Sequence, residues 1–496
     1  MNVKKTVFLL LPAFAVTSFS VSAEEDLRTL IKAMSGKMAE LDNQVKQSNR
    51  RIAELEEKLA QSEREKALVS SAAPAAQPPG AQATTVAAGA TPQVPAAVEK
   101  PKTAPAVAVG DAKGTFKIPG SDTSLGFGGY VKLDANYSSI GMGGDKLGDQ
   151  HLVISQIPVG DNRLGEHSKS TFHAKESRFW LKSFTPSSWG DIDTFLEVDF
   201  LGASDVSTYT PRLRHAYGSI GNFLGGFTWT TFLNVAAIPE TLDTTGPAGD
   251  LLNLRQPVVR WTQPFTVAGT ALEFQAAVES PKSRLWTDPQ LRESTDAYNF
   301  TNPNDERYPD LIARLNYSPD WGTLSLAAMG RQIRYTKQTT NRQQEAWGGA
   351  ISLAGKINTV GMDNVKFMLG YGDAYGRYAA FNAFEDAALD ASGLLQLVNV
   401  YSAMASYQHW WNKAWRSTLA YSFSAADQPA FVQQAVNLNG SIGEMNRQAQ
   451  SAHINLLWSP WLSTTFGLEY FYVLRERADG QTGDLNRVQF SSRFNF

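Results

Sequence analysis

The chain contains no cysteine among its 496 residues. This absence excludes disulfide bonds, zinc sites with cysteine ligands, iron–sulfur clusters and a thiol nucleophile. Long apolar stretches are also scarce, since the mean hydropathy is -0.27. A bundle of transmembrane helices, each needing about 20 consecutive apolar residues, is therefore excluded. Finally, the sequence has 45 Lys and Arg residues and 48 Asp and Glu residues, so it lacks the excess of basic residues that is typical of a nucleic-acid-binding protein.

The first residues predict an export signal. Lys4 and Lys5 precede an apolar run of ten residues, 7–16, which is too short to span a bilayer. Residues 21–23 read Val-Ser-Ala and provide a cleavage site, so we expect a signal peptide over residues 1–23. The alternative is an uncleaved anchor, which Pro12 and the serines after it disfavour because they interrupt a longer apolar run.

Two further N-terminal segments have distinct compositions. Residues 24–69 place apolar side chains at alternating spacings of three and four, which predicts a periplasmic coiled coil and hence an oligomer. The alternative is one amphipathic helix docked on the rest of the chain, and the spacing does not separate a dimer from a trimer. Residues 70–114 are rich in Ala and Pro, lack periodicity and predict a disordered linker. The apolar positions of the coiled coil are Leu27, Ile31, Met34, Met38, Leu41, Val45, Ile52, Leu55 and Leu59.

Residues 115–496 alternate between apolar and polar side chains. In residues 124–137, Leu125, Phe127 and Val131 share one face, while Lys132 and Asp134 lie on the other. This period of two predicts an all-β transmembrane barrel of about 16 antiparallel strands around a water-filled lumen. A soluble sandwich also alternates, but the export signal favours the membrane. The strands are expected to begin near Ser124, Thr171, Asp191, Pro211, Asn222, Arg255, Ala271, Pro309, Gly322, Ala346, Asn364, Gln396, Arg416, Arg447, Thr464 and Leu485.

Features at the strand ends favour the outer membrane of a Gram-negative bacterium. Short turns such as residues 318–322 alternate with long polar segments such as residues 281–308, as expected for periplasmic turns and external loops. The last strand ends in Phe496, a pattern like the signal for the barrel-assembly machinery. We therefore expect contact with outer-membrane lipid and lipopolysaccharide. Aromatic side chains expected to form an interfacial girdle are Tyr137, Trp189, Trp229, Trp261, Tyr317, Trp321, Trp410, Trp411, Trp415, Trp458 and Trp461.

The expected lumen is rich in basic side chains. Residues 234–254 form a long connection that we expect to fold inward, so that Glu240, Asp243 and Asp250 oppose a basic wall. Opposed charges at a constriction create a transverse field, and rings of Arg and Lys favour anions. The alternative is that the arginines only pair with Glu176, Asp193, Glu197 and Asp199 on neighbouring strands. The basic residues predicted to point inward are Lys132, Arg178, Lys182, Arg212, Arg214, Arg260, Arg314, Arg331, Arg416, Arg487 and Arg493.

The order of signal, heptad segment, linker and barrel resembles the DcaP-like trimeric porins of Gram-negative outer membranes. The motifs that carry the resemblance are spread over nearly the whole mature chain: residues 118–137, 177–186, 195–200, 211–232, 239–243, 246–249, 376–378, 408–412 and 487–496. The resemblance implies a homotrimer of 16-stranded barrels that takes up small, often negatively charged solutes such as dicarboxylates by passive diffusion.

Two other function classes were weighed. An outer-membrane enzyme would need a catalytic motif, and neither G-x-S-x-G nor H-E-x-x-H occurs in the sequence. We therefore expect no catalytic residue, cofactor, metal or nucleic-acid partner. An adhesin or structural anchor with a narrow or plugged barrel is the remaining alternative to a channel.

Overall fold

The structure is a computed structural model that describes residues 108–143, 146–160, 167–203, 205, 207–248, 254–288, 300–301, 305–337, 341–380, 383–432 and 445–496. The predicted signal peptide, the coiled coil and nearly all of the linker lie outside these residues. None of the helices within these ranges has the length and apolar character needed to cross a membrane.

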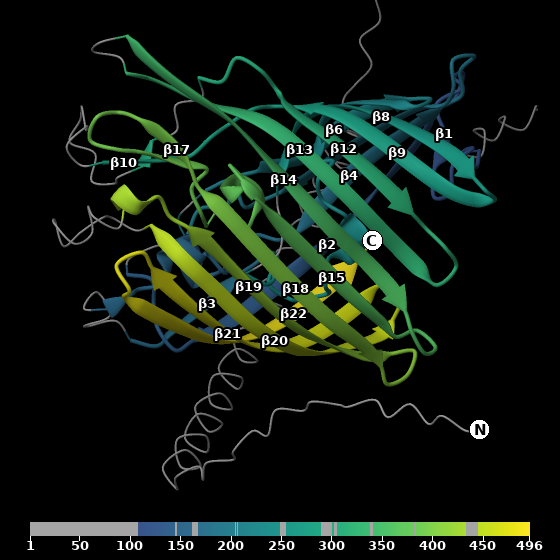
Figure 1. Cartoon of the computed structure of the whole chain (residues 1–496). Coiled ribbons are helices and arrows are strands. Elements are labelled where there is room, and N and C mark those ends of the chain that lie inside the picture. Colours follow the sequence, from purple (N-terminus) through teal and green to yellow (C-terminus); the bar gives the residue numbers. More distant parts are fainter. Residues whose placement is uncertain are drawn as a thin grey trace, which may run out of the picture. The chain divides into compact units, whose positions relative to one another are not determined.

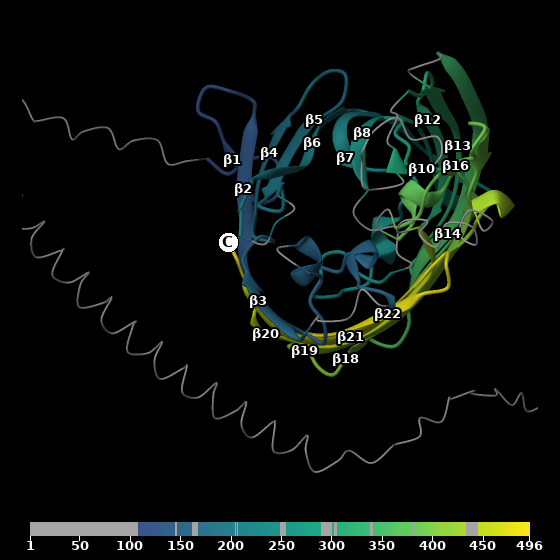
Figure 2. The ribbon, with the colours of Figure 1, turned by 90° about the vertical axis from the view of Figure 1, so that its left-hand side faces the viewer.

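Sixteen antiparallel strands of the described chain form one closed barrel (Figures 1 and 2). The barrel closes because β2 pairs with β22 on one side and with β4 on the other. The predicted number of strands is therefore confirmed. The strands are β2 Ser124–Ser138, β4 Arg178–Thr185, β5 Ile192–Asp199, β6 Arg212–Ile220, β7 Phe223–Trp229, β8 Arg255–Val267, β9 Thr270–Glu279, β12 Asp310–Tyr317, β13 Gly322–Lys337, β14 Arg342–Asn358, β15 Asn364–Asp373, β18 Asn399–Trp410, β19 Trp415–Asp427, β20 Asn446–Trp461, β21 Thr464–Arg477 and β22 Thr482–Asn495.

Smaller elements complete the described part of the fold. β3 (Lys169–His173) pairs with the same strand as β4, so the two are one interrupted strand, and β1 (Phe116–Lys117) pairs with the start of β2. A separate four-stranded sheet contains β10 (Leu285–Thr287), β11 (Phe300–Thr301), β16 (Ala387–Leu389) and β17 (Leu395–Leu397). The short 3-10 helices are η1 Leu147–Asp149, η2 Ile154–Gln156, η4 Val235–Ala237 and η6 Gly376–Tyr378.

The faces of the barrel wall follow the predicted alternation. On β2, Phe127 and Val131 are 67% and 49% exposed, whereas Lys132 and Asp134 are buried. Because apolar side chains point outward and charged ones inward, the outer surface suits hydrocarbon and the inner surface suits water or ions. A soluble sandwich would have the opposite arrangement.

Three strands begin three or four residues away from the predicted position. β22 begins at Thr482 rather than near Leu485. β14 begins at Arg342 rather than near Ala346, because its first residues are polar on both faces and carry no alternating signal. β18 begins at Asn399, whereas the expected start at Gln396 belongs to β17 of the small sheet.

Short turns gather at one end of the barrel and long connections at the other. β6 and β7 are joined by two residues, Gly221 and Asn222, and Gly221 has a φ of 53°, which glycine adopts without strain. The end that carries these turns is called the short-turn end below. At the other end, long connections follow β7, β9 and β15, and their described residues are 230–248, 254, 280–288, 300–301, 305–309, 374–380 and 383–398.

Part of the interior is packed with side chains, which corrects the expectation of a water-filled lumen across the whole barrel. Phe232, Tyr375 and Tyr378 from the long connections lie in one buried cluster with Met329 and Met404 from the inner wall. The Phe232 ring centroid lies 5.9 Å from that of Tyr375 and 5.8 Å from that of Tyr378. The connections therefore fill one side of the lumen and leave the remaining passage beside the charged wall.

Candidate functional site: a charged constriction inside the barrel

The connection between β7 and β8 crosses the interior of the barrel. It contains η4 and the residues that follow it, and Figure 2 shows connecting segments running inside the ring of strands. Its backbone is held from several strands: Lys366 Nζ of β15 donates to the Ile238 carbonyl oxygen at 2.7 Å, and Asn455 Nδ2 of β20 donates to the Glu240 carbonyl oxygen at 2.8 Å. This segment, called the inward segment below, therefore narrows the passage.

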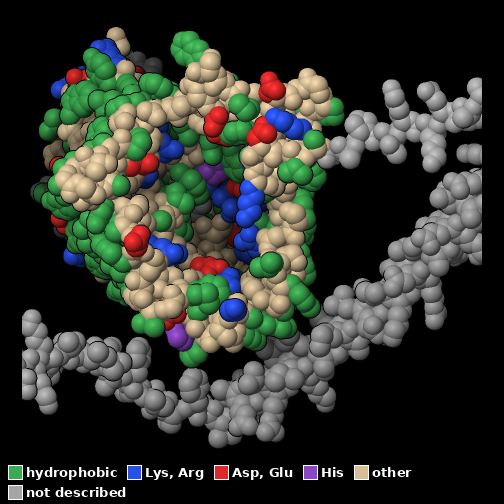
Figure 3. Space-filling model, turned by 90° about the vertical axis from the view of Figure 1, so that its right-hand side faces the viewer, with side chains coloured by type: hydrophobic (Ala, Val, Ile, Leu, Met, Phe, Trp, Pro, Cys, Tyr) green, Lys and Arg blue, Asp and Glu red, His purple; other side chains and the backbone are tan. Residues whose placement is uncertain are grey.

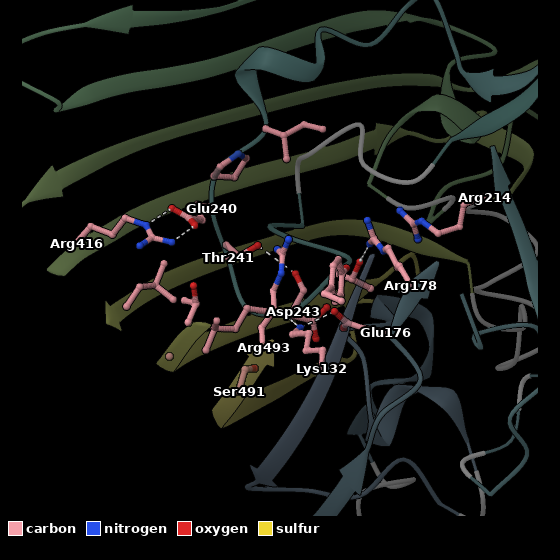
Figure 4. A pocket seen from close by; sticks show the side chains of 18 of the residues that line it. Lys132, Glu176, Arg178, Arg214, Glu240, Thr241, Asp243, Arg416, Ser491 and Arg493 are labelled. Carbon is pink, nitrogen blue, oxygen red and sulfur yellow. Dashed lines mark hydrogen bonds and ion pairs between the residues drawn. The ribbon is translucent and has the colours of Figure 1, made fainter. Parts of the chain in front are cut away.

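Glu240 anchors the inward segment to the opposite wall. Both carboxylate oxygens accept hydrogen bonds from the Arg416 guanidinium of β19, at 2.7 and 2.6 Å (Figure 4). Burial alone would raise the pKa of Glu240, but the hydrogen bonds and charge of Arg416 outweigh it and hold the pKa below its usual value. Glu240 is therefore an anion at neutral pH, and the pair is a bidentate charge-assisted contact.

A second group of charges lies around Lys132. Its ammonium group donates to Glu176 and to the Leu242 carbonyl oxygen at 2.7 Å, and it lies 3.1 Å from Asp134. Next to it, the Asp243 carboxylate accepts from the Leu152 backbone N–H at 2.9 Å. Lys132 thus fixes the inward segment to β2. Its positive charge is neutralised by two carboxylates, Glu176 and Asp134, and adds little to the electrostatic potential of the passage.

Arg212 and Arg214 are engaged by carboxylates on the neighbouring strand. The Arg212 guanidinium donates to both oxygens of Asp199, at 3.0 and 2.7 Å. Arg214 donates to Glu197 and to Asp199 at 2.7 Å each. For these two arginines the structure has the pairing that the sequence left open as the alternative. Their charges are largely balanced within the wall.

Other arginines of the inner wall form no such close ion pair. Within the described ranges, Arg255, Arg260, Arg314 and Arg493 take part in no ion pair, and Arg178 lies only as close as 3.8 Å to Glu197. Buried guanidinium nitrogens without an acceptor are Arg178 Nε, Arg255 Nη1, Arg260 Nε and Arg314 Nε. Since a buried unsatisfied donor is costly, these groups are suited to meet an anion or water.

The inward segment and the wall enclose a cavity of about 350 Å³ (Figure 4). Five basic side chains line it against three acidic ones, so positive charge is in excess. Figure 3 shows this face of the molecule hollowed, with Lys and Arg side chains gathered along one side of the opening. The basic residues are Lys132, Arg178, Arg214, Arg416 and Arg493, and the acidic residues are Glu176, Glu240 and Asp243.

Two other residues that the sequence predicts to point inward, Lys182 and Arg331, do not line this cavity. Lys182 lies nearer the short-turn end, where its ammonium donates to the Lys113 carbonyl oxygen at 2.9 Å. Arg331 points inward but is fully buried between Asp310 and Asp386, so it supports the long connections and does not face the passage. Asp250 lies outside the described residues.

Two residues lie elsewhere than the sequence predicts. Trp229 does not belong to an outer aromatic girdle, since it lines the cavity and its ring lies 4.4 Å from the Arg255 guanidinium. Arg255 was not predicted to face inward, because it begins a strand where the alternation gives no direction. In the part of the chain that is described, no cluster of His, Asp and Glu has the geometry to hold a metal ion.

Comparisons with known proteins give one family. The model of the DcaP outer membrane protein family matches residues 111–496. The crystal structure of the outer membrane channel DcaP of Acinetobacter baumannii is similar at 22% identity and a TM-score of 0.61, covering 78% of this chain and 100% of that chain. An anion-selective porin from Comamonas acidovorans is similar at 12% identity and a TM-score of 0.42, covering 75% of this chain and 100% of its own. No curated protein matches the chain significantly.

Proposed function

The chain belongs to the DcaP outer membrane protein family, and from this premise we propose that it is a passive outer-membrane channel that favours small anions, dicarboxylates among them. The coarser part of this statement, a porin-type channel of the outer membrane, follows from the family and the closed barrel. The preference for anions goes beyond the family and the fold, and it is what we propose for this chain.

One observation carries the anion preference. Arg255, Arg260 and Arg314 have no carboxylate partner among the described residues, although each has a buried guanidinium nitrogen without an acceptor. A charge held inside a lumen with low-dielectric walls focuses its field on the passage, so arginines without a carboxylate in contact raise the local concentration of anions. The bidentate Glu240–Arg416 contact holds the inward segment beside this wall.

The assembly and placement of the chain are part of the same proposal. We propose a homotrimer with the N-terminal segment, residues 24–114, in the periplasm after removal of the signal peptide over residues 1–23. Phe490 and Phe494 of β22 are outward-facing and about half exposed. This arrangement supports recognition by the barrel-assembly machinery and subsequent contact with lipid and lipopolysaccharide.

Swelling of liposomes that contain the purified full chain tests the solute class. The panel pairs solutes of similar size and different charge: succinate, the uncharged succinamide, and a diamine of the same chain length. We expect the dianion to enter fastest and the diamine slowest, because the wall attracts the first and repels the second. Faster entry of the diamine, or swelling no faster than in protein-free liposomes, would contradict the proposal.

A further inference from the structure

Three aromatic side chains lie side by side on the inner wall of the barrel. They are Trp180 of β4, Phe195 of β5 and Tyr217 of β6. The ring centroids of Trp180 and Phe195 are 6.3 Å apart with an interplanar angle of 27°, and those of Phe195 and Tyr217 are 5.8 Å apart at 40°. Because each ring contacts the next across neighbouring strands, the three form a continuous surface, called the aromatic strip below.

The aromatic strip faces the lumen and not the lipid. On the same strands, Leu181 and Leu196 are the outward residues, and they are 45% and 43% exposed on the outer surface. Trp180 lies directly opposite Gly128 of β2, where a Cβ would approach the indole Cζ2 to 2.5 Å. Glycine at this position therefore leaves the room in which the indole lies flat against the inner wall.

The strip is not part of the packed core. All three rings are partly exposed, whereas Phe232 and Phe384, which belong to the core cluster, are 1% and 0% exposed. The inner face of a transmembrane barrel with an aqueous lumen is normally polar. Three adjacent aromatic rings that keep part of their surface toward the passage are therefore a surface that can receive an apolar part of a solute.

Basic groups border the strip on the side of the constriction and at its edge. Arg178 lies two residues before Trp180 on the same face of β4, and its Nε has no acceptor. Lys182 lies two residues after Trp180, with its ammonium 5.6 Å from the indole ring. The carboxylates nearby are Glu197, which Arg214 holds at 2.7 Å and which lies 3.8 Å from Arg178, and Asp193 toward the short-turn end. Positive charge thus remains available beside the rings.

We propose that the aromatic strip together with Arg178 is a binding site for solutes that join a planar aromatic ring to a carboxylate. The ring stacks on Trp180 and Phe195, and the carboxylate meets the Arg178 guanidinium, whose contacts in the wall are long: 3.5 Å to Thr244 Oγ1 and 3.8 Å to Glu197. This inference deepens the proposed anion channel and rests on it for the direction of charge. The site would slow such solutes in the passage and raise their local concentration.

Blockade of the ionic current through single channels in a planar bilayer tests the site. The probes are benzoate and cyclohexanecarboxylate, which have the same charge and similar size but differ in having a flat aromatic ring. In the native chain we expect benzoate to block with the higher affinity. The substitution Phe195→Leu should reduce the ratio of the two affinities by about threefold to tenfold, as expected for the loss of one aromatic stacking contact. Tyr217→Leu provides a second variant in case the first does not fold.

The matched control is Phe127→Leu, the same substitution on an outward-facing ring of β2 that is 67% exposed. It should leave the affinity ratio at its native value. Equal affinities in the native chain would overturn the proposal, as would a ratio unchanged by Phe195→Leu and Tyr217→Leu. Blockade by maltose that depends on Phe195, without blockade by benzoate, would also overturn it in favour of a sugar site. Because both probes are anions, a cation-selective channel would refute the proposed function without altering this comparison.

Discussion

At the scale of single residues, the partner of an arginine decides what its charge can do in this lumen. Arg214 is 2% exposed and lies between Glu197 and Asp199, so its charge stabilises the wall. Arg416 is engaged by Glu240 and therefore positions the inward segment. Arg255 has no ion-pair partner among the described residues, and its guanidinium lies over the Trp229 ring. Sequence could count these arginines, but it could not show which of them meet a carboxylate.

The Glu240–Arg416 pair gives a prediction at this scale. Replacing Glu240 by Gln removes the charge from a bidentate contact and leaves Arg416, whose side chain is 10% exposed, without its counter-ion. Hydrogen bonds to charged groups contribute about 1.5–3 kcal/mol each, and the partial exposure of Glu240 reduces that figure. We expect the inward segment to detach more often, which single-channel recordings would register as more frequent current steps. The matched control is Asp320→Asn on an exposed turn.

The same contact predicts a dependence on pH. Because the pKa of Glu240 is lowered in the docked segment, docking is stabilised fully above the ordinary pKa of a glutamate and loses that stabilisation as the pH falls through the lower, docked value. The native channel should therefore become noisier in acid, below about pH 4. The E240Q variant should be noisy at neutral pH and change less on acidification. Identical records for the two proteins at both pH values would refute this role of Glu240.

At the scale of strands, most of the fold follows from the alternation of apolar and polar residues, because a side chain on one face of a strand meets lipid and its neighbour meets the lumen. The alternation fails at one informative place. The register between β5 and β6 shifts between Glu197 and Val198, so that Arg214 is an extra residue and both it and His215 are turned toward the interior. Strict alternation from Arg214 would have directed Tyr217 outward. The place of Tyr217 in the aromatic strip was therefore not predictable, since no sequence signal marks this bulge.

Strand length gives a prediction on assembly. β4, β5, β6 and β7 have 8, 8, 9 and 7 residues, whereas β13 and β14 have 16 and 17. An eight-residue tilted strand rises roughly 20 Å along the barrel axis, less than the apolar band of about 25 Å that a barrel presents to lipid. We expect the outer face of these short strands, β4 to β7, to be covered by neighbouring copies of the chain.

Substitutions on the two sides of the wall test that expectation. Leu181→Gln combined with Leu196→Gln places polar groups on the outer face of the short strands and should convert a trimer into monomers that still conduct. The control is Leu353→Gln on the outer face of β14, which is 43% exposed and should leave the trimer intact. Analytical ultracentrifugation in detergent measures the mass of each species. A native protein that sediments as a monomer, or a trimer unaffected by the paired substitution, would contradict the interface.

At the scale of the whole molecule, closure of the barrel was predictable and the filling of its interior was not. An even number of alternating strands in lipid must close to satisfy its edges. The paths of the long connections depend on contacts between residues distant in sequence, such as Asn234 Nδ2 with Ser325 Oγ at 2.9 Å. Sequence therefore suggested that residues 234–254 fold inward, but it gave no sign that Tyr375 turns into the lumen, where its hydroxyl lies 3.0 Å from Ser402 Oγ of β18.

The account depends on an excess of positive charge along the passage, and the reversal potential in a potassium chloride gradient measures it most directly. The native channel should give a potential of the sign for chloride preference. Replacing Arg255, Arg260 and Arg314 together by Gln should reduce that potential, whereas Arg447→Gln, on an exposed arginine paired with Glu476, should not. The account would be contradicted if the sign of the reversal potential of the native channel showed a preference for potassium. It would also be contradicted if the triple substitution left the reversal potential unchanged.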